Sequence, residues 1–262
     1  MKQMTLMTYN IRNMHGDQGV HGWENRKAHV AALIAGRAPD VLCVQEAFWP
    51  QMEYLLESLP GYAAYGVGRD DGDKAGEYAA VFYRTDRFRL TDSQTIWLSE
   101  TPDHPSHGWD ATYHKRICTT VQLSPLDGSA PFYAASLHLD DRGVEARRQS
   151  ALLLRRYFAP VLASSQCFVA GDYNATPADE PYQIMNQPPF YDARITADEF
   201  SDFASSRGFD CDRLEFGSGP IDHVFYNQGA LRPVRAEILT VKRGGEFPSD
   251  HFPLLCTFES RE

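Results

Sequence analysis

Residues 166–174 read Gln-Cys-Phe-Val-Ala-Gly-Asp-Tyr-Asn. The apolar, β-branched first part predicts a strand over 166–170, and Gly171 marks the point where the chain turns away from it. Asp172 and Asn174 follow directly. Because side chains held at the end of a rigid sheet are where binding and catalytic groups concentrate, this stretch predicts a sheet with a functional site at one edge.

The same arrangement recurs along the chain, where other apolar runs also end in a residue with an oxygen or imidazole group. These runs predict strands whose ends gather around a common site. The segments are residues 8–12, 42–46, 135–140, 220–223 and 248–253.

Strand and helix patterns are mixed and do not alternate strictly, which argues against a parallel barrel or a doubly wound sheet. Two packed sheets with helices outside suit this order, and with no linker or repeat we expect one domain over residues 1–262. Strands are predicted over 4–11, 41–45, 79–83, 117–123, 132–138, 166–170, 221–226, 235–241 and 253–258, and helices over 23–36, 50–58 and 144–162.

The charge balance is acidic, with a net charge of −10 and a sequence pI near 5.4. The chain therefore lacks the global basic field that draws proteins onto duplex nucleic acid. This lowers the expectation of a nuclease without removing it, because a local basic patch or bound cations can reverse the sign at one face. No phosphate-binding or dinucleotide-binding glycine motif is present.

Cysteine usage and hydropathy favour the cytoplasm as the default location. The five cysteines, Cys43, Cys118, Cys167, Cys211 and Cys256, form no metal-binding spacing and are expected to be reduced core residues. The sequence starts directly in a strand pattern with no signal-peptide segment, and no apolar run reaches the ~18 to 20 residues of a membrane helix. We expect no stable membrane insertion.

Each polar residue at a strand end has an ordinary structural explanation when it is taken alone. Asn10 can bond a loop carbonyl, and Glu46 can cap the helix that follows it. Asp172 and Asn174 flank a turn, where such residues are common, and histidines such as His138 are often structural.

Taken together, the same residues supply what metal-assisted phosphoryl transfer needs. Mg²⁺ prefers oxygen ligands and is usually held by one or two carboxylates plus the substrate phosphate. In-line attack also needs an activated water, a charge clamp on the non-bridging oxygens and stabilisation of the leaving oxygen. Candidates for these roles are Asn10, Glu46, His138, Asp172, Asn174, Asp222, Asp250 and His251.

The chain resembles the endonuclease/exonuclease/phosphatase superfamily, the deoxyribonuclease I-like proteins. The matching motifs are Tyr9-Asn10-Ile11, Gln45-Glu46, Ser136-Leu137-His138-Leu139-Asp140, Gly171-Asp172-Tyr173-Asn174, Ile221-Asp222-His223 and Ser249-Asp250-His251. This resemblance implies an α/β (α+β) four-layer sandwich of two packed, mixed and mostly antiparallel sheets flanked by helices. The site would lie at one edge of the sandwich.

The resemblance also implies roles around the metal and the attacking water. Glu46 would be the principal Mg²⁺ carboxylate, with Asn10 and Asp250 close to the metal, and Mn²⁺ is an alternative ion. Asp172 would orient or deprotonate the water. Asn174 would hold the phosphate.

Two histidines would act with carboxylate partners in the same scheme. His251, oriented by Asp222, would polarise the scissile phosphate or take part in proton transfer. His138 would do similar work, with Glu77 as the candidate for its partner. A carboxylate partner fixes the imidazole tautomer and raises its pKa.

Three further residues are candidates for substrate contact. The segments 68–72, 76–78, 97–102 and 108–111, together with Arg116, resemble a bacterial branch of the superfamily whose substrates are poorly defined. Trp109 could stack on a sugar or base, while Arg116 and Arg69 could bind phosphate oxygens through their planar donor forks. The alternative is that Trp109 packs a loop and Arg69 pairs with neighbouring aspartates.

Three functions compete on this evidence. The favoured one is Mg²⁺-dependent hydrolysis of a small or exposed phosphomonoester or phosphodiester: a sugar phosphate, a lipid headgroup or a short nucleotide. The second is an endo- or exonuclease acting on DNA or RNA, which would need a basic surface beside the site. The third is a binding protein that kept the fold without catalysis. The sequence leaves the oligomeric state open.

Overall fold

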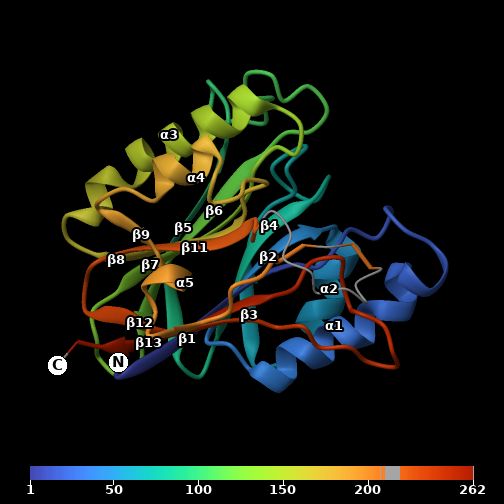
Figure 1. Cartoon of the computed structure of the whole chain (residues 1–262), viewed down its shortest axis with the longest axis horizontal. Coiled ribbons are helices and arrows are strands. Elements are labelled where there is room, and N and C mark those ends of the chain that lie inside the picture. Colours follow the sequence, from blue (N-terminus) through green and yellow to red (C-terminus); the bar gives the residue numbers. More distant parts are fainter. Residues whose placement is uncertain (207, 210–218, 262) are drawn as a thin grey trace.

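The computed structural model describes residues 1–206, 208–209 and 219–261. Two β-sheets pack face to face, and helices cover the outer face of each, which makes four layers (Figure 1). This architecture confirms the predicted two-sheet sandwich with outer helices.

The first sheet has seven strands in the order β10-β12-β13-β1-β2-β4-β3. Parallel pairing of β1 with β2 and of β10 with β12 interrupts an otherwise antiparallel sheet. The strands are β1 (Gln3–Asn10), β2 (Val41–Ala47), β3 (Tyr62–Tyr65), β4 (Tyr78–Arg84), β10 (Glu199–Phe200), β12 (Leu231–Ile238) and β13 (Leu254–Ser260).

The second sheet has six strands in the order β5-β6-β7-β8-β11-β9, with β7 and β8 parallel. The strands are β5 (Phe88–Trp97), β6 (Ile117–Pro125), β7 (Phe132–His138), β8 (Gln166–Asp172), β9 (Phe190–Asp192) and β11 (Asp222–Asn227).

Three apolar layers hold the sandwich together. The central layer fills the space between the sheets, where Leu6 and Val81 of one sheet meet Val121 and Phe168 of the other. The outer layers lie under the helices, where residues such as Ile34 and Leu154 are fully buried. The helices are η1 (Gly19–His21), α1 (Trp23–Arg37), α2 (Trp49–Ser58), α3 (Val144–Leu162), α4 (Glu180–Met185) and α5 (Ala193–Thr196).

The strands that sequence patterning missed are short or lie at a sheet edge. β3, β9 and β10 have four, three and two residues, too few to show an alternation. β5 is an edge strand whose polar side chains alternate into solvent. The strand expected over 235–241 is instead β12 (Leu231–Ile238), because Pro233 sits at a register shift that hides its start.

Strand register brings the functional strand ends together. His138 at the end of β7 and Asp222 at the start of β11 both pair with Asp172, the last residue of β8. In the other sheet, Asn10 at the end of β1 lies opposite Gln45 of β2. The chemically active side chains of both sheets therefore meet at one edge of the sandwich.

Cys43, Cys118, Cys167 and Cys256 are buried free thiols, as expected, whereas Cys211 lies outside the described residues. Among the helices of the described residues, none combines the length and apolar character needed to cross a membrane.

Candidate active site

A polar cavity of about 250 Å³ opens at the edge where the strand ends meet. Nine of the residues singled out from the sequence line it. Asn10 and Asp222 do not line it, but they bond the lining residues Asp172 and His251. The nine are Glu46, Arg69, Glu77, Arg116, His138, Asp172, Asn174, Asp250 and His251.

Asn10 joins the two sheets at the base of the cavity. Its side-chain amide donates to Glu46 at 2.9 Å and to Asp172 at 3.0 Å, so one buried amide holds a carboxylate of each sheet. The backbone and side-chain amides of Asn13 donate to the other oxygen of Glu46, both at 3.0 Å. Burial acts to raise the pKa of Glu46, but these hydrogen bonds and nearby His251 outweigh it and lower the pKa.

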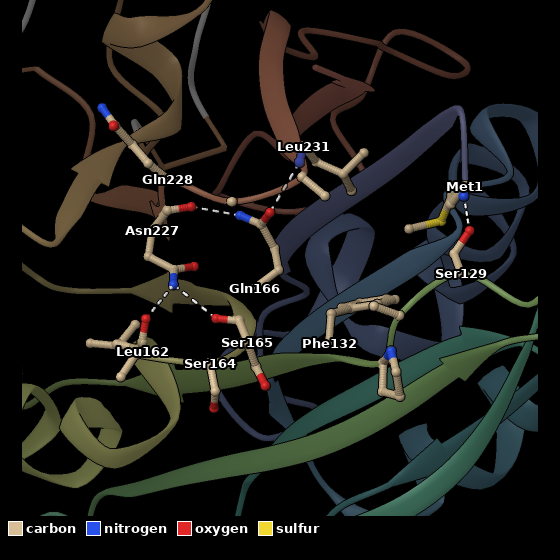
Figure 2. Close-up of a pocket in the computed structure, with 15 residues that line it drawn as sticks. Met1, Ser129, Phe132, Leu162, Ser164, Ser165, Gln166, Asn227, Gln228 and Leu231 are labelled. Carbon is tan, nitrogen blue, oxygen red and sulfur yellow. Dashed lines mark hydrogen bonds between the residues drawn. The ribbon is translucent and has the colours of Figure 1, made fainter. Parts of the chain in front are cut away.

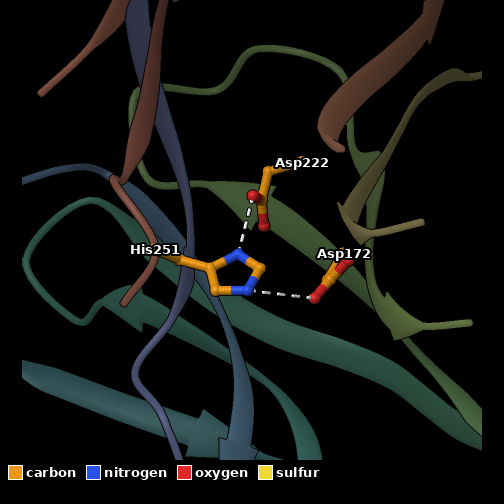
Figure 3. Close-up of side chains that lie close together, drawn as sticks. All are labelled: Asp172, Asp222 and His251. Atoms are coloured by element: carbon orange, nitrogen blue, oxygen red, sulfur yellow. Dashed lines mark hydrogen bonds and ion pairs between the residues drawn. The ribbon is translucent and has the colours of Figure 1, made fainter. Parts of the chain in front are cut away.

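His251 lies between two carboxylates (Figure 3). Its Nδ1 is 2.9 Å from Oδ2 of Asp222, and its Nε2 is 3.7 Å from Oδ2 of Asp172. Burial opposes protonation of the imidazole, but the two carboxylates prevail and hold the pKa of His251 well above its ordinary value. Burial raises the pKa of Asp172, against the attraction of His251. The pair therefore holds a proton in a buried position next to the cavity.

His138 has the opposite electrostatic character. Burial, followed by the positive charges of Arg116 and Arg69, holds the pKa of His138 well below its ordinary value, so the ring is neutral. Its Nε2 is 3.1 Å from the side-chain amide of Asn174 and 3.5 Å from Oδ2 of Asp172. The cavity thus presents one charged and one neutral imidazole on the two sides of Asp172.

Glu77 does not partner His138 as the resemblance implied. Its carboxylate accepts from Arg69 at 2.6 Å and from Asn13 at 3.4 Å, while Nδ1 of His138 has no hydrogen-bond partner among the described residues. The buried guanidinium of Arg69 outcompetes a neutral imidazole for this carboxylate. Burial and the nearby charge of Glu46 still raise the pKa of Glu77 to about 7, against Arg69.

The two candidate arginines are built into one wall of the cavity. Arg69 and Arg116 are only 6% and 4% exposed, which few arginines reach without carboxylate partners. Arg116 donates to Asp140 at 3.1 Å and to Asp141 at 2.7 Å, while Arg69 pairs with Glu77 rather than with the adjacent aspartates.

Trp109 lies outside the lining of the cavity. It is half-buried in the loop between β5 and β6, and its backbone N–H donates to Glu100 at 3.2 Å. Stacking of Trp109 on a sugar or base therefore stays a prediction. His223, which follows Asp222, is structural: it is fully buried and lies 2.9 Å from the carbonyl of Ala175.

Sequence reasoning missed four residues that line the cavity: Arg12, Asn13, His114 and Asp141. Arg12 approaches Asp250 at 3.6 Å. Asn13 and Asp141 lie within three residues of Asn10 and His138, and this proximity in sequence could have indicated that they line the cavity. His114 stands in a loop without any periodic pattern, so nothing in the sequence marked it.

Three of the five non-glycine residues with positive φ in the described part of the chain line this cavity. Arg12, Glu46 and Asn174 adopt the left-handed region, with φ of 58°, 63° and 45°. Glu46 also sits where the pairing of β2 with β4 shifts register between Gln45 and Ala47. A bulge of this kind re-aims a side chain, and strained non-glycine residues persist only where surrounding contacts hold them. The fold therefore directs Glu46 into the cavity at a conformational cost.

The donor set fits a divalent cation. Glu46, Asp172 and Asp250 present carboxylates to the cavity, and carboxylate oxygens are ligands that Mg²⁺ prefers. Donor atoms of Asp172, Asp222 and His251 also lie within 4.8 Å of one another. Since metal binding requires a neutral imidazole, the protonated state of His251 favours the Glu46 side for the ion.

A second cavity, of about 340 Å³, lies where the turn after α3 approaches the β11–β12 connection (Figure 2). Its walls contain Gln166 and Asn227, which bond each other and nearby backbone, but no Asp, Glu, His, Lys or Arg side chain among the described residues. Among the described residues of this lining, the only titratable group is the N-terminal amino group of Met1.

The strand ends of the two sheets thus bring together carboxylates, one charged and one neutral imidazole, and oxygen donors that fit a cation. This combination suits the hydrolysis of a phosphoester. Residues 7–251 match the model of the Endonuclease/Exonuclease/phosphatase family, and the chain belongs to that family. It is a hydrolase that acts on phosphoester bonds.

Several relatives resemble the whole chain. An uncharacterised protein, L388, of Acanthamoeba polyphaga mimivirus is 27% identical over 98% of this chain and 100% of that protein. Human nocturnin is 24% identical over 92% of this chain, which spans 59% of the length of nocturnin.

Solved structures agree with the sequence comparisons. A family protein from Bacteroides thetaiotaomicron superposes with a TM-score of 0.92 at 31% identity, covering 99% of this chain and 95% of its own. A mannosyl-6-phosphatase from the same species gives a TM-score of 0.90 at 32% identity, covering 97% and 99%.

Proposed function

We propose that this chain is a Mg²⁺-dependent phosphoesterase that hydrolyses a small or exposed phosphomonoester or phosphodiester by in-line attack of an activated water. The observation that carries the proposal is the bridge made by Asn10, which bonds Glu46 and Asp172 and so fixes a metal-binding carboxylate beside a proton acceptor.

Glu46, Asn10 and Asp250 would hold the ion. Oε1 of Glu46 accepts one amide hydrogen, from Asn10, and keeps a lone pair for a cation, whereas Oε2 already accepts two hydrogens from Asn13. An ion held there would supply positive charge that stabilises the transition state, and Mn²⁺ would suit the same oxygen ligands as Mg²⁺.

Asp172 takes the proton of the attacking water as the new P–O bond forms. Its raised pKa suits this task, because a general base works best with a pKa near the working pH. The P–O bond to the leaving group then breaks, and the leaving oxygen takes up a proton. The products of a monoester are an alcohol and inorganic phosphate.

The two histidines divide the remaining work according to their charge. Protonated His251, held by Asp222, places positive charge on the non-bridging oxygens. Neutral His138 and the amide of Asn174, 3.1 Å apart, hold the phosphate from the opposite side. Unequal environments of this kind assign different roles to chemically similar groups.

Arg69 and Arg116 would contact the phosphate or the group attached to it. Their bonds to Glu77, Asp140 and Asp141 fix both guanidinium groups in the cavity wall before substrate arrives. Such preorganisation reduces the entropy lost on binding.

A small substrate is favoured by three observations. The cavity encloses only about 250 Å³, the chain carries a net charge of −10, and a mannosyl-6-phosphatase is among the 32%-identical neighbours. A sugar phosphate is therefore the first substrate to test.

Nucleic acid is the second candidate substrate. A probable RNA exonuclease of Schizosaccharomyces pombe is 24% identical over 71% of this chain. The same side chains would serve nuclease chemistry. Salt dependence separates a nuclease from an enzyme for small esters, because binding that neutralises several backbone phosphates weakens steeply as salt increases.

The experiment is a turnover assay with Mg²⁺, Mn²⁺ or EDTA against sugar phosphates, a chromogenic phosphodiester, single-stranded and duplex DNA, and RNA. Chelator-sensitive turnover of small esters that is insensitive to salt supports the proposal. Salt-sensitive cleavage of DNA or RNA alone replaces it with the nuclease, and turnover that persists in EDTA refutes the metal role.

A further inference from the structure

The hydroxyl of Ser205 is fully buried beside Asp222, and its hydrogen bonds can be assigned completely. The backbone N–H groups of Ile221 and Asp222 both donate to its Oγ at 3.0 Å. A hydroxyl has one hydrogen and two acceptor lone pairs. Because both lone pairs are occupied, the hydroxyl hydrogen points to Oδ2 of Asp222, 2.6 Å away.

That oxygen is the same one that binds His251. Oδ2 of Asp222 accepts hydrogen bonds from the hydroxyl of Ser205 and from Nδ1 of His251. Oδ1 has no hydrogen-bond partner among the described residues. The orientation of the carboxylate between these two donors therefore depends on Ser205.

The backbone of the same segment fixes the chain around His251. The N–H of Phe252 donates to the carbonyl of Ser205 at 2.6 Å, and Ser206 forms an isolated β-bridge with His251. Residues 205 and 206 thus hold the imidazole through its own backbone and through its carboxylate partner.

We infer that Ser205 is a positioning residue of the hydrolytic reaction, one that acts on the reacting phosphate through Asp222 and His251. This inference rests on the proposed function of His251. Outer-shell groups that orient a metal-binding imidazole typically contribute 10- to 100-fold, and we expect a similar range for a group that orients His251. We expect Ser205→Ala to lower kcat about tenfold or more and to leave KM nearly unchanged, because Ser205 does not line the cavity.

The test is a double-mutant cycle on kcat with the full chain and a sugar phosphate or chromogenic phosphodiester that the wild type turns over. The variants are Ser205→Ala, Asp222→Asn and the double variant, with His251→Ala as a reference. Ser150→Ala is the matched control, because Ser150 is a buried serine of α3 that does not line the cavity. If Ser205→Ala folds poorly, Ser205→Cys, of similar size but a weak donor, enters the same cycle.

Action through Asp222 predicts that the Ser205 substitution costs turnover in the wild-type background and little in the Asp222→Asn background. Equal losses in both backgrounds, or a rise in KM without a fall in kcat, would overturn the inference. Wild-type turnover by Ser205→Ala while His251→Ala is inactive would overturn it and leave the proposed function intact. Full activity of His251→Ala would overturn both.

Discussion

Nδ1 of His251 lies 2.9 Å from Oδ2 of Asp222, so a carboxylate of the second sheet orients an imidazole that the loop before β13 supplies. Burial alone would lower the pKa of His251 and deprotonate the ring, and the carboxylate of Asp222 opposes this effect. The contact explains how the cavity keeps a positive imidazole among buried side chains.

Replacing Asp172 by Asn should remove the proton acceptor and keep the shape of the site. We expect kcat to fall by about 100- to 10,000-fold, the usual contribution of general acid–base catalysis. Steady-state kinetics and a thermal unfolding curve measure the two properties together. Asp198→Asn, an exposed carboxylate that pairs with Arg232, is the control. A fully active Asp172→Asn enzyme would contradict the mechanism.

Replacing Glu46 by Gln should mainly change the use of metal. The variant keeps the amide contacts in part but loses the charge that attracts a cation. We expect the Mg²⁺ concentration for half-maximal activity to rise about 10- to 100-fold, by analogy with other losses at metal sites. A Mg²⁺ titration after EDTA treatment measures it, and an unchanged half-maximal concentration would exclude Glu46 as the principal ligand.

Gly171 stands where two parallel strands leave no room for a side chain. Its φ is 156°, and a Cβ there would collide with the backbone carbonyl of Leu137. Gly171→Ala should lower the free energy of unfolding by more than about 1 kcal/mol. Gly36→Ala is the control with the opposite expected sign, because no atom lies within 4 Å of the place that a Cβ would occupy in α1. It should raise the free energy of unfolding by about 0.5–1 kcal/mol. Urea unfolding compares the two, and equal effects would refute the packing argument.

His223 should make the protein less stable in mild acid. Burial lowers its pKa in the folded state, so below about pH 6.5 the unfolded chain binds a proton that the folded chain refuses. Stability contributed by the neutral ring is therefore present at higher pH and lost as pH falls. Urea midpoints from about pH 7 to pH 5 should decrease less for His223→Gln than for the wild type. Parallel pH profiles would show that another group is responsible.

Much of the fold could be predicted because long buried strands and amphipathic helices leave periodic patterns. The helix over 144–162 was predicted with the bounds it has, and the strand at Phe132–His138 likewise. Edge strand β5 escaped because packing on only one side leaves its sequence largely polar.

The site could be predicted as a set of residues but not as a set of contacts. The pattern of strand ends predicted Asp172 and His251. It could not predict the partner of Glu77, which is Arg69, because a loop places that arginine, 8 residues earlier in the chain. The strained turn at Glu46 and the position of Trp109 outside the cavity likewise follow from tertiary packing. Single-sequence patterns carry no record of these tertiary contacts.

The bridge at Asn10 has a kinetic consequence for how the molecule becomes active. Asn10 bonds Asp172, 162 residues away, and its carbonyl accepts from Ser249, 239 residues away. Contacts of such sequence separation require most of the chain to be ordered before they form, and they are among the slowest to be gained. Enzymatic activity should therefore return only at the end of refolding, and neither half of the chain alone can assemble the site.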